Sequence, residues 1–136
     1  MASYQWLPNP VGEMLRSSNL ATTARVPLSG TLVITTGHVG VDLQTGQLVT
    51  SSLDAEFNAI FDCLDAALEN AGVKAGLASA HKIVAYFTHA EYEQVMLGIF
   101  RGRYPESTPT WTSVVVAGIV NEGVHAEVQA EAVADT

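Results

Sequence analysis

The chain is poor in the residues that several common kinds of site require. Among its 136 residues there is one cysteine, Cys63, and only six basic residues against fourteen acidic ones. A single cysteine excludes an internal disulfide bond and a cysteine-rich zinc site. The formal net charge of -8 repels phosphate backbones, so no nucleic-acid partner is expected. No apolar run approaches the roughly 18 residues of a membrane span, so no membrane partner is expected either.

Motifs for metals, nucleotides and common hydrolytic sites are also missing. No two of the four histidines have helical i, i+4 spacing with a carboxylate partner, and neither a P-loop nor a G-x-S-x-G sequence occurs. We therefore expect no metal and no cofactor. The first residues lack a basic stretch followed by an apolar one, which predicts a cytoplasmic protein.

The composition is that of a packed protein. Hydrophobic residues make up 48% and charged residues 15% of the chain, and its length suits a single domain over residues 1–136. So low a charged fraction suggests that other subunits cover part of the apolar surface. A large core would give the same composition.

Two segments have the apolar periodicity of helices that cover a core. The first is residues 51–71, with Ser51 or Ser52 as the N-cap and Gly72 just after the end. Its apolar stripe consists of Phe57, Ile60, Phe61, Leu64, Ala67 and Leu68. The second helix is predicted over residues 91–103. Cys63 lies within the first helix and is interpreted as a packing residue.

Strands are predicted between and around these helices. Residues 24–28 and 31–36 suggest a hairpin that turns at Ser29-Gly30, and residues 81–88 form a third strand. The β-branched run in 109–119 predicts a largely buried strand, and a hairpin turn at 121–123 is expected to join it to a last strand over 124–134. Residues 1–24 are irregular by pattern and could form a short strand plus a loop.

The order of these elements indicates a two-layer α+β domain. Two helices alternate with the strands, and both must cover a face of the sheet. If they lie on the same face, the other face remains open, and oligomerisation could cover it. A carboxylate in the apolar tail, Glu131, lies either on a solvated face or in a cleft, where burial would suit it to proton transfer.

Three segments resemble a known family in their order and spacing. They are Ile34–His38 (ITTGH), 66–72 (AALENAG) and 126–134 (AEVQAEAVA), and they resemble the YjgF/YER057c/UK114 family, also called the Rid or L-PSP family. Residues 82–87 are similar to the central strand of that family. The likeness spans most of the chain.

The resemblance implies a chorismate-mutase-like fold with a mixed sheet, assembled as a homotrimer with small-molecule clefts between subunits. Its best-known members hydrolyse reactive enamines and imines to 2-keto acids and ammonia, and others have been described as ribonucleases or translation inhibitors. In the deaminases an arginine clamps the substrate carboxylate, and a cysteine two residues later often lines the cleft. A glutamate near the C-terminus is thought to orient water.

Carried over by position, the family's glutamate falls on Glu131. The family also has a Ser-Gly pair at the corresponding end of the early strand, and this pair falls on Thr36 and Gly37. The cysteine position falls on Ser113. The arginine position falls on Trp111, which departs from the deaminase pattern. The aromatic residue that the family has near its first strand is absent, because Thr23 or Ala24 stands there.

The missing arginine changes the expected ligand. A guanidinium binds a carboxylate through two charge-assisted hydrogen bonds, whereas an indole has one N–H and no charge. We therefore expect a cleft for flat, apolar or aromatic molecules, with Trp111 and Tyr86 as an apolar wall. Thr36 and Ser113 would supply hydroxyls, and the backbone N–H of Gly37 could stabilise an oxyanion.

Three functions follow from these residues. The first is an enzyme that deaminates or tautomerises an enamine, an imine or a less polar metabolite, with Glu131 as the acid/base. The second is a non-catalytic ligand-binding or regulatory trimer in which Trp111 fills the cleft. The third, an L-PSP-type endoribonuclease, ranks last because six basic residues give no obvious phosphate-binding stripe.

Overall fold

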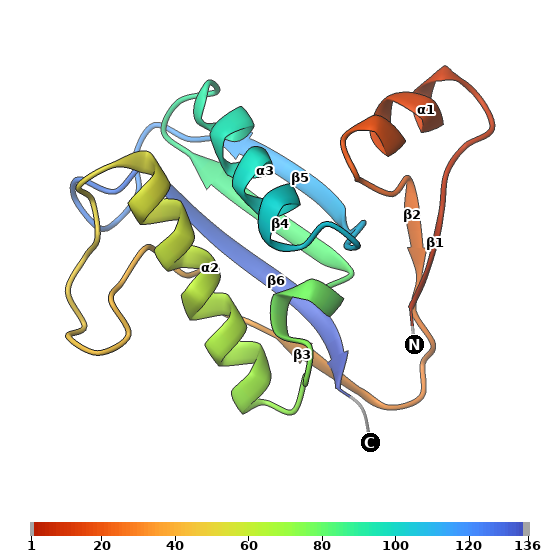
Figure 1. The fold of residues 1–136 in the computed structure, drawn as a ribbon, viewed down its shortest axis with the longest axis horizontal. Helices are drawn as coiled ribbons and strands as arrows, with labels where there is room; N and C mark the ends of the chain where they lie inside the picture. The colour runs from red at the N-terminus through yellow and green to blue at the C-terminus, as the bar shows by residue number, and fades with distance from the viewer. Residues whose placement is uncertain (1, 135–136) are drawn as a thin grey trace.

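The computed structural model describes residues 2–134, which form one four-stranded sheet, one two-stranded ribbon and the helices around them (Figure 1). In chain order the elements are β1 (Ser3–Gln5), α1 (Pro10–Ser17), β2 (Thr23–Arg25), β3 (Thr31–Ile34), α2 (Leu53–Asn70), the 3₁₀-helix η1 (Gly76–Ser79), β4 (Lys82–Phe87), α3 (Tyr92–Arg103), β5 (Thr110–Val115) and β6 (Ala126–Ala134). The large sheet has the order β3-β6-β4-β5. β4 and β5 are parallel and the other neighbours antiparallel, so the predicted mixed sheet is confirmed.

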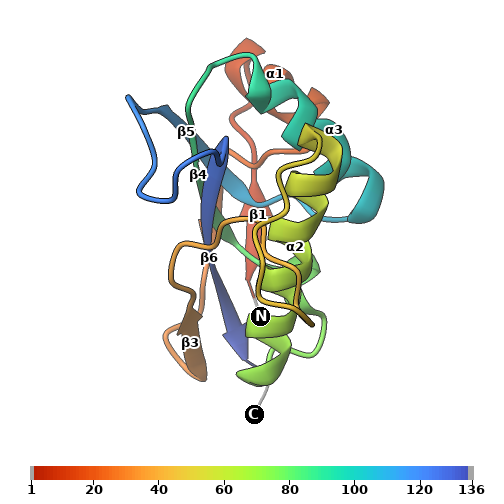
Figure 2. The ribbon, with the colours of Figure 1, turned by 90° about the vertical axis from the view of Figure 1, so that its left-hand side faces the viewer.

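The helices α2 and α3 lie together on one side of this sheet, as Figure 2 shows, which confirms the predicted two-layer arrangement. The central strand β6 explains how the layers meet. Its alternate residues are buried alanines and Val128, which face the helices, while Glu127, Gln129, Glu131 and Val133 are only half-buried and point the other way. Small side chains on the covered face let α2 approach the strand closely.

Local signals fixed the ends of the helices. The Ser52 hydroxyl accepts a hydrogen bond from the backbone N–H of Ala55 (3.0 Å) and caps α2, as predicted. Gly72 follows the end of α2 with φ +97°, a conformation that favours glycine. The helix α1 was not predicted, although Asn9 caps it by accepting from the N–H groups of Val11 and Gly12. Its eight residues are too few to establish an apolar period.

The predicted hairpin of residues 24–28 and 31–36 is wrong. β2 pairs with β1, and β3 pairs with β6, so the two arms join different sheets. Ser29-Gly30 does lie where the chain turns, with Gly30 at φ +97°. A turn signal shows where a chain reverses but not which strands then pair, and Pro27 lacks the N–H that a paired arm would donate.

The second predicted hairpin, at residues 121–123, is also wrong. β5 and β6 are not neighbours, because β4 lies between them. The helix α3 connects β4 to β5, and this crossover lets β5 pair in parallel with β4. β5 forms one edge of the sheet. As an edge strand it is less buried than predicted, with Val115 56% exposed in the single chain, and residues 116–119 leave the sheet.

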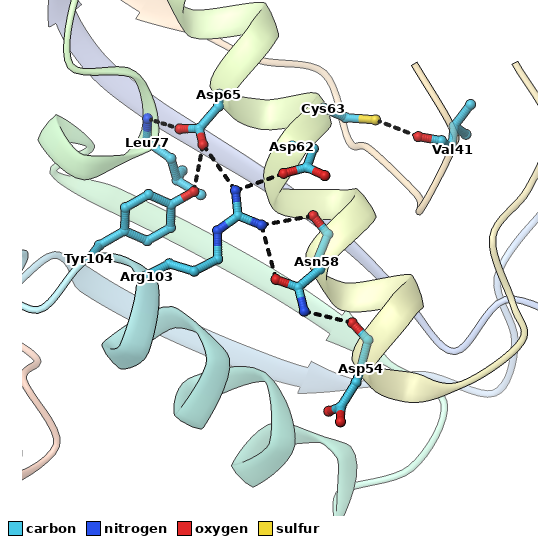
Figure 3. A network of polar contacts seen from close by, with 9 residues as sticks. All are labelled: Val41, Asp54, Asn58, Asp62, Cys63, Asp65, Leu77, Arg103 and Tyr104. Atoms are coloured by element: carbon cyan, nitrogen blue, oxygen red, sulfur yellow. Dashed lines mark hydrogen bonds and ion pairs between the residues drawn. The ribbon is translucent and has the colours of Figure 1, made fainter. Parts of the chain in front are cut away.

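An ionic network holds α2, α3 and η1 together (Figure 3). The Asp65 carboxylate on α2 accepts hydrogen bonds from the Leu77 N–H (2.8 Å), the Tyr104 hydroxyl (2.7 Å) and the Arg103 guanidinium (3.3 Å). Arg103 also pairs with the more exposed Asp62 at 2.7 Å. Burial, together with the bond to Asp65, raises the pKa of Tyr104 well above its usual range. The network therefore fixes how the helices sit over the sheet.

Candidate functional site

The face of the sheet opposite α2 and α3, which we call the open face, carries two of the six predicted site residues, Tyr86 and Glu131. It presents Ile34 from β3, Tyr86 from β4, and Glu127, Gln129 and Glu131 from β6. Their side chains share this face because residues two apart on a strand point the same way. Two acidic groups therefore lie on a surface that also holds apolar and aromatic side chains.

Glu131 lies near the end of the open face where β4 begins. Its Cα neighbours across the sheet are Ile34 and Lys82, and its side chain is 27% exposed. One carboxylate oxygen, Oε2, lies 3.4 Å from Nε2 of the buried His81. A carboxylate beside an imidazole can pass a proton to or from a bound molecule, which is the chemistry that acid/base catalysis requires.

Tyr86 lies elsewhere on the open face, opposite Glu127 in the sheet register. Together with Gln129, Val116 and residues 118–120, these two side chains line a shallow hollow of about 260 Å³. Glu127 and Gln129 were not predicted as site residues. The alternation along residues 126–134 could have identified them, since it places them on the same face as Glu131.

Thr36 and Gly37 follow β3 along the edge of β6. The next residue, His38, exchanges two backbone hydrogen bonds with Val128 (2.8 and 3.0 Å). A Cβ on Gly37 would collide with the Glu127 carboxylate, so the backbone at this glycine runs close to that side chain. The structure therefore brings Gly37 into contact with Glu127 and, through it, near Tyr86.

Cys63 lies in a groove of about 670 Å³ between α2 and the 36–43 loop, and Thr36 and Gly37 line the same groove. Its thiol is buried and donates to the Val41 carbonyl oxygen (3.2 Å), and burial raises its pKa. A thiol that stays protonated is a poor nucleophile. The predicted packing role of Cys63 is confirmed.

Trp111 and Ser113 lie on β5 and point toward the helix layer. Trp111 is the register partner of the buried Ile83, and its ring packs edge-on against Phe100 with the centroids 5.3 Å apart. Its Nε1–H donates to the Ser113 hydroxyl (3.0 Å). Tyr86 points to the opposite face, so within one chain Trp111 and Tyr86 do not line the same wall. Successive side chains of a strand point to alternate faces of the sheet. Tyr86 lies three residues after Ile83, the partner of Trp111, and therefore points to the other face.

The predicted ligand residues occupy opposite edges of the sheet. Thr36 and Gly37 follow β3, whereas Trp111 and Ser113 lie on β5, with β6 and β4 between them. Three strand spacings amount to about 14 Å. A small ligand cannot contact both groups within one chain.

A buried carboxylate that sequence reasoning missed lies at the other end of the sheet. Glu56 is fully buried, and one carboxylate oxygen, Oε2, accepts from the backbone N–H groups of both His125 (2.7 Å) and Ala126 (3.3 Å). The His125 ring nitrogen Nδ1 lies 2.6 Å from the other oxygen. These contacts tie α2 to the start of β6, so Glu56 is structural.

Two further findings on residues 2–134 concern metal-binding groups and membrane-spanning helices. These residues contain no group of three or more histidine, cysteine, aspartate or glutamate side chains placed to hold a metal ion. None of their helices is both long enough and apolar enough to span a membrane.

Comparison with solved structures places this fold among known proteins. The Rid family protein YyfB from Yersinia pestis superposes with a TM-score of 0.80 at 16% identity, covering 97% of this chain and 98% of its own. The YjgF gene product of E. coli gives a TM-score of 0.65 at 23% identity, covering 79% and 84%. E. coli TdcF, solved with bound serine, gives 0.66 at 22%, covering 81% and 85%.

The sequence itself carries the family assignment, since identities this low establish only the fold. A search of curated proteins gave no match to the chain. The sequence model described as Endoribonuclease L-PSP matches residues 21–134, which include the whole four-stranded sheet, α2 and α3. The chain therefore belongs to the L-PSP family, the family of the Rid and YjgF proteins.

Proposed function

We propose that this protein acts on a small molecule in a cleft formed between copies of the chain. One observation carries the proposal: the predicted ligand residues lie at opposite edges of the sheet, about 14 Å apart. They can line one cleft only if the β5 edge of one chain meets the β3 end of another. A closed homotrimer brings these edges together three times.

The apolar side chains of the open face support such an assembly. Leu32 and Ile34 on β3 are 52% and 61% exposed, and Val114 on β5 is 37% exposed. These residues leave an apolar surface around the acidic groups of the open face. Burying it against other copies is favourable because apolar surface leaves water.

In this cleft Glu131 acts as the acid/base. For an imine, its carboxylate removes a proton from water as the water oxygen bonds to the carbon of the C=N group. The carboxylic acid so formed returns the proton to nitrogen, which gives a carbinolamine. In a second transfer the carboxylate moves the hydroxyl proton to nitrogen as the C–N bond breaks and the C=O bond forms, giving a carbonyl compound and ammonia. The imidazole of His81, 3.4 Å away, supports this proton exchange.

The substrate is less polar than an imino acid, because Trp111 replaces the arginine of the deaminases. E. coli TdcF was solved with serine, a ligand that carries a carboxylate. In this chain no guanidinium stands at the equivalent position to bind such a group. A tautomerisation, in which Glu131 moves a proton between carbon and nitrogen, fits the same residues.

A non-catalytic ligand-binding trimer is the second candidate, and one observation favours it. The Trp111 ring packs against Phe100 and its N–H is already engaged by Ser113. The Trp111 side chain therefore has its packing and hydrogen-bond partners within the chain, and in this candidate it fills the space that a substrate needs. This candidate predicts saturable binding without a product.

The test compares matched carboxylate variants in an imine hydrolysis assay. 2-Iminopropionate and a less polar aryl imine are generated in situ, and their loss is followed with the wild type, Glu131→Gln, Glu127→Gln and Glu122→Gln. Glu122 lies on an exposed loop and serves as the control. Light scattering on each variant reports the oligomeric state.

We expect faster loss of the aryl imine than of 2-iminopropionate, and a loss of about 10²–10⁴-fold in rate for Glu131→Gln alone. Full activity of Glu131→Gln together with inactive Glu127→Gln would transfer the acid/base role to Glu127. Saturable ligand binding without turnover by any form would favour the non-catalytic trimer. A monomer in solution would refute the shared cleft.

A further inference from the structure

The groove between α2 and the 36–43 loop, which we call the α2 groove, has an apolar lining. On the α2 side it is lined by small or short side chains at helical spacings of three and four: Cys63, Ala66, Ala67 and Asn70. Val39, Val41 and Leu43 form the other wall, and Leu43 is 60% exposed. None of the side chains that line the groove is charged. An apolar segment can therefore cover this groove without removing a charge from water.

The segment that follows β5, residues 116–120, is an exposed apolar tip. Its sequence, VAGIV, contains no charged side chain and no hydroxyl group. Val120 is 99% exposed, so its side chain has no packing partner among residues 2–134. Figure 2 shows the stretch between β5 and β6 on the side of the sheet away from α2 and α3. The apolar tip is thus open to contact with another copy of the chain.

The strand directions place the α2 groove and the apolar tip at the same end of the sheet. β3 and β4 both run antiparallel to β6, so they are parallel to each other. β5 runs parallel to β4 and hence also to β3. The chain therefore leaves β3 toward the groove, and leaves β5 toward the tip, at one end of the sheet but at its two opposite edges.

A ring of copies brings the tip of one chain to the groove of the next. In the proposed trimer the β5 edge of one chain meets the β3 end of another. A rotation about an axis along the strands preserves their direction, so neighbouring β5 and β3 strands end at the same level. The tip then lies beside Thr36 and Gly37 of the next chain, which line its α2 groove. Within one chain the tip lies near Tyr86 on the open face, and the sheet separates it from α2.

We propose that the apolar tip of one copy inserts into the α2 groove of the next copy, with Val120 as the side chain that enters. The proposal rests on the edge-to-edge assembly of the proposed function and names the segment that closes it. The small side chains of Ala66 and Ala67 leave room for Val120, which is stabilised there by leaving water. No charge is buried, although the chain carries fourteen acidic residues. The tip also adds a wall beside Thr36 and Gly37, so each ligand cleft is incomplete without the neighbouring copy.

The experiment joins the tip to the groove by a disulfide bond between copies. The full chain with Cys63→Ser, which then lacks cysteine, receives Val120→Cys and Ala67→Cys together. One control pairs Ala67→Cys with Met14→Cys, at another exposed apolar residue, and a second pairs Val120→Cys with Gln94→Cys, at an exposed position of α3. Each protein is oxidised briefly and separated on a denaturing gel without reductant. Sedimentation of Val120→Asp and Met14→Asp measures association without a cross-link.

We expect Val120→Cys with Ala67→Cys to give covalently linked copies up to the trimer of a closed ring. Both control pairs should give at least about tenfold less product, since a disulfide requires Cα atoms within about 7 Å. Val120→Asp should weaken association at least about tenfold, whereas Met14→Asp should leave it unchanged.

Equal products from the control pairs, an intact oligomer without cross-links, or a monomer would overturn the proposal. The gel does not depend on turnover. A cross-linked trimer that fails to hydrolyse imines would therefore support the contact and contradict the proposed catalysis. An oligomer that hydrolyses imines but forms no cross-link would have the opposite meaning.

Discussion

Replacing Asp65 by asparagine tests the network that positions α3 and η1 against α2. The carboxylate accepts from a backbone N–H of η1, from the Tyr104 hydroxyl and from Arg103 (Figure 3). An asparagine of the same shape keeps one oxygen and replaces the other by an NH₂ group. An NH₂ group only donates hydrogen bonds. In one orientation of the amide it therefore meets the donors of Tyr104 and Arg103, and in the other it meets the N–H of Leu77.

The expected loss follows from the contacts. Hydrogen bonds to a charged group each stabilise a protein by about 1.5–3 kcal/mol. The asparagine oxygen still serves one of the two short contacts, and Arg103 retains its pair with Asp62, so about one charge-assisted bond is lost. We expect the free energy of unfolding to fall by about 2 kcal/mol. In urea this moves the midpoint by about 1 M.

Asp62→Asn is the matched control. Asp62 pairs with the same arginine at 2.7 Å, but its side chain is 54% exposed. Exposed ion pairs stabilise by only about 0.2–1 kcal/mol because water screens them. Both variants are unfolded in urea at one fixed protein concentration and followed by far-UV circular dichroism. Equal losses for Asp62→Asn and Asp65→Asn would refute the reasoning from burial.

Three other changes have clear expected results. Ile34→Asp places a charge on the open face and should dissociate the oligomer without unfolding the chain, as measured by sedimentation; an intact oligomer would contradict the proposed interface. Gly37→Ala pushes aside the Glu127 carboxylate, the end of a flexible, half-buried side chain, so the free energy of unfolding in urea should fall by no more than about 1 kcal/mol, and adding Glu127→Ala should restore it. The Cys63 thiol should react slowly with a disulfide reagent at pH 8, because burial raises its pKa, and rapid labelling of the folded protein would contradict this. The free energy of unfolding should also fall as pH rises past 9.0, the ordinary pKa of a thiol, because only the unfolded thiol ionises there.

The helices were predictable because their signals are local. Ser52 and Gly72 terminate α2 through contacts within a few residues, and the apolar stripe from Phe57 to Leu68 needs only the helical period. The packing of both helices on one face followed from the same stripes. By contrast α1 depends on Asn9 and on a close backbone approach at Gly12, which no period reveals.

Strand pairing was not predictable in the same way. The run of β-branched residues in β3 predicts a strand, but whether it joins β2 or β6 depends on the whole sheet. The crossover through α3 places β5 beside β4, and this leaves the other side of β4 for β6. Both predicted hairpins failed for this reason.

For the site, the sequence by itself determined the family, the chemistry of the candidate residues and the absence of an arginine at Trp111. Only the tertiary structure decided which of these residues meet. It placed Glu131 beside His81, Gly37 against Glu127, and Trp111 on the face opposite Tyr86. The physical reason is that residue types and periods are encoded locally, whereas strand order, which sets these distances, arises from the packing of segments far apart in the chain.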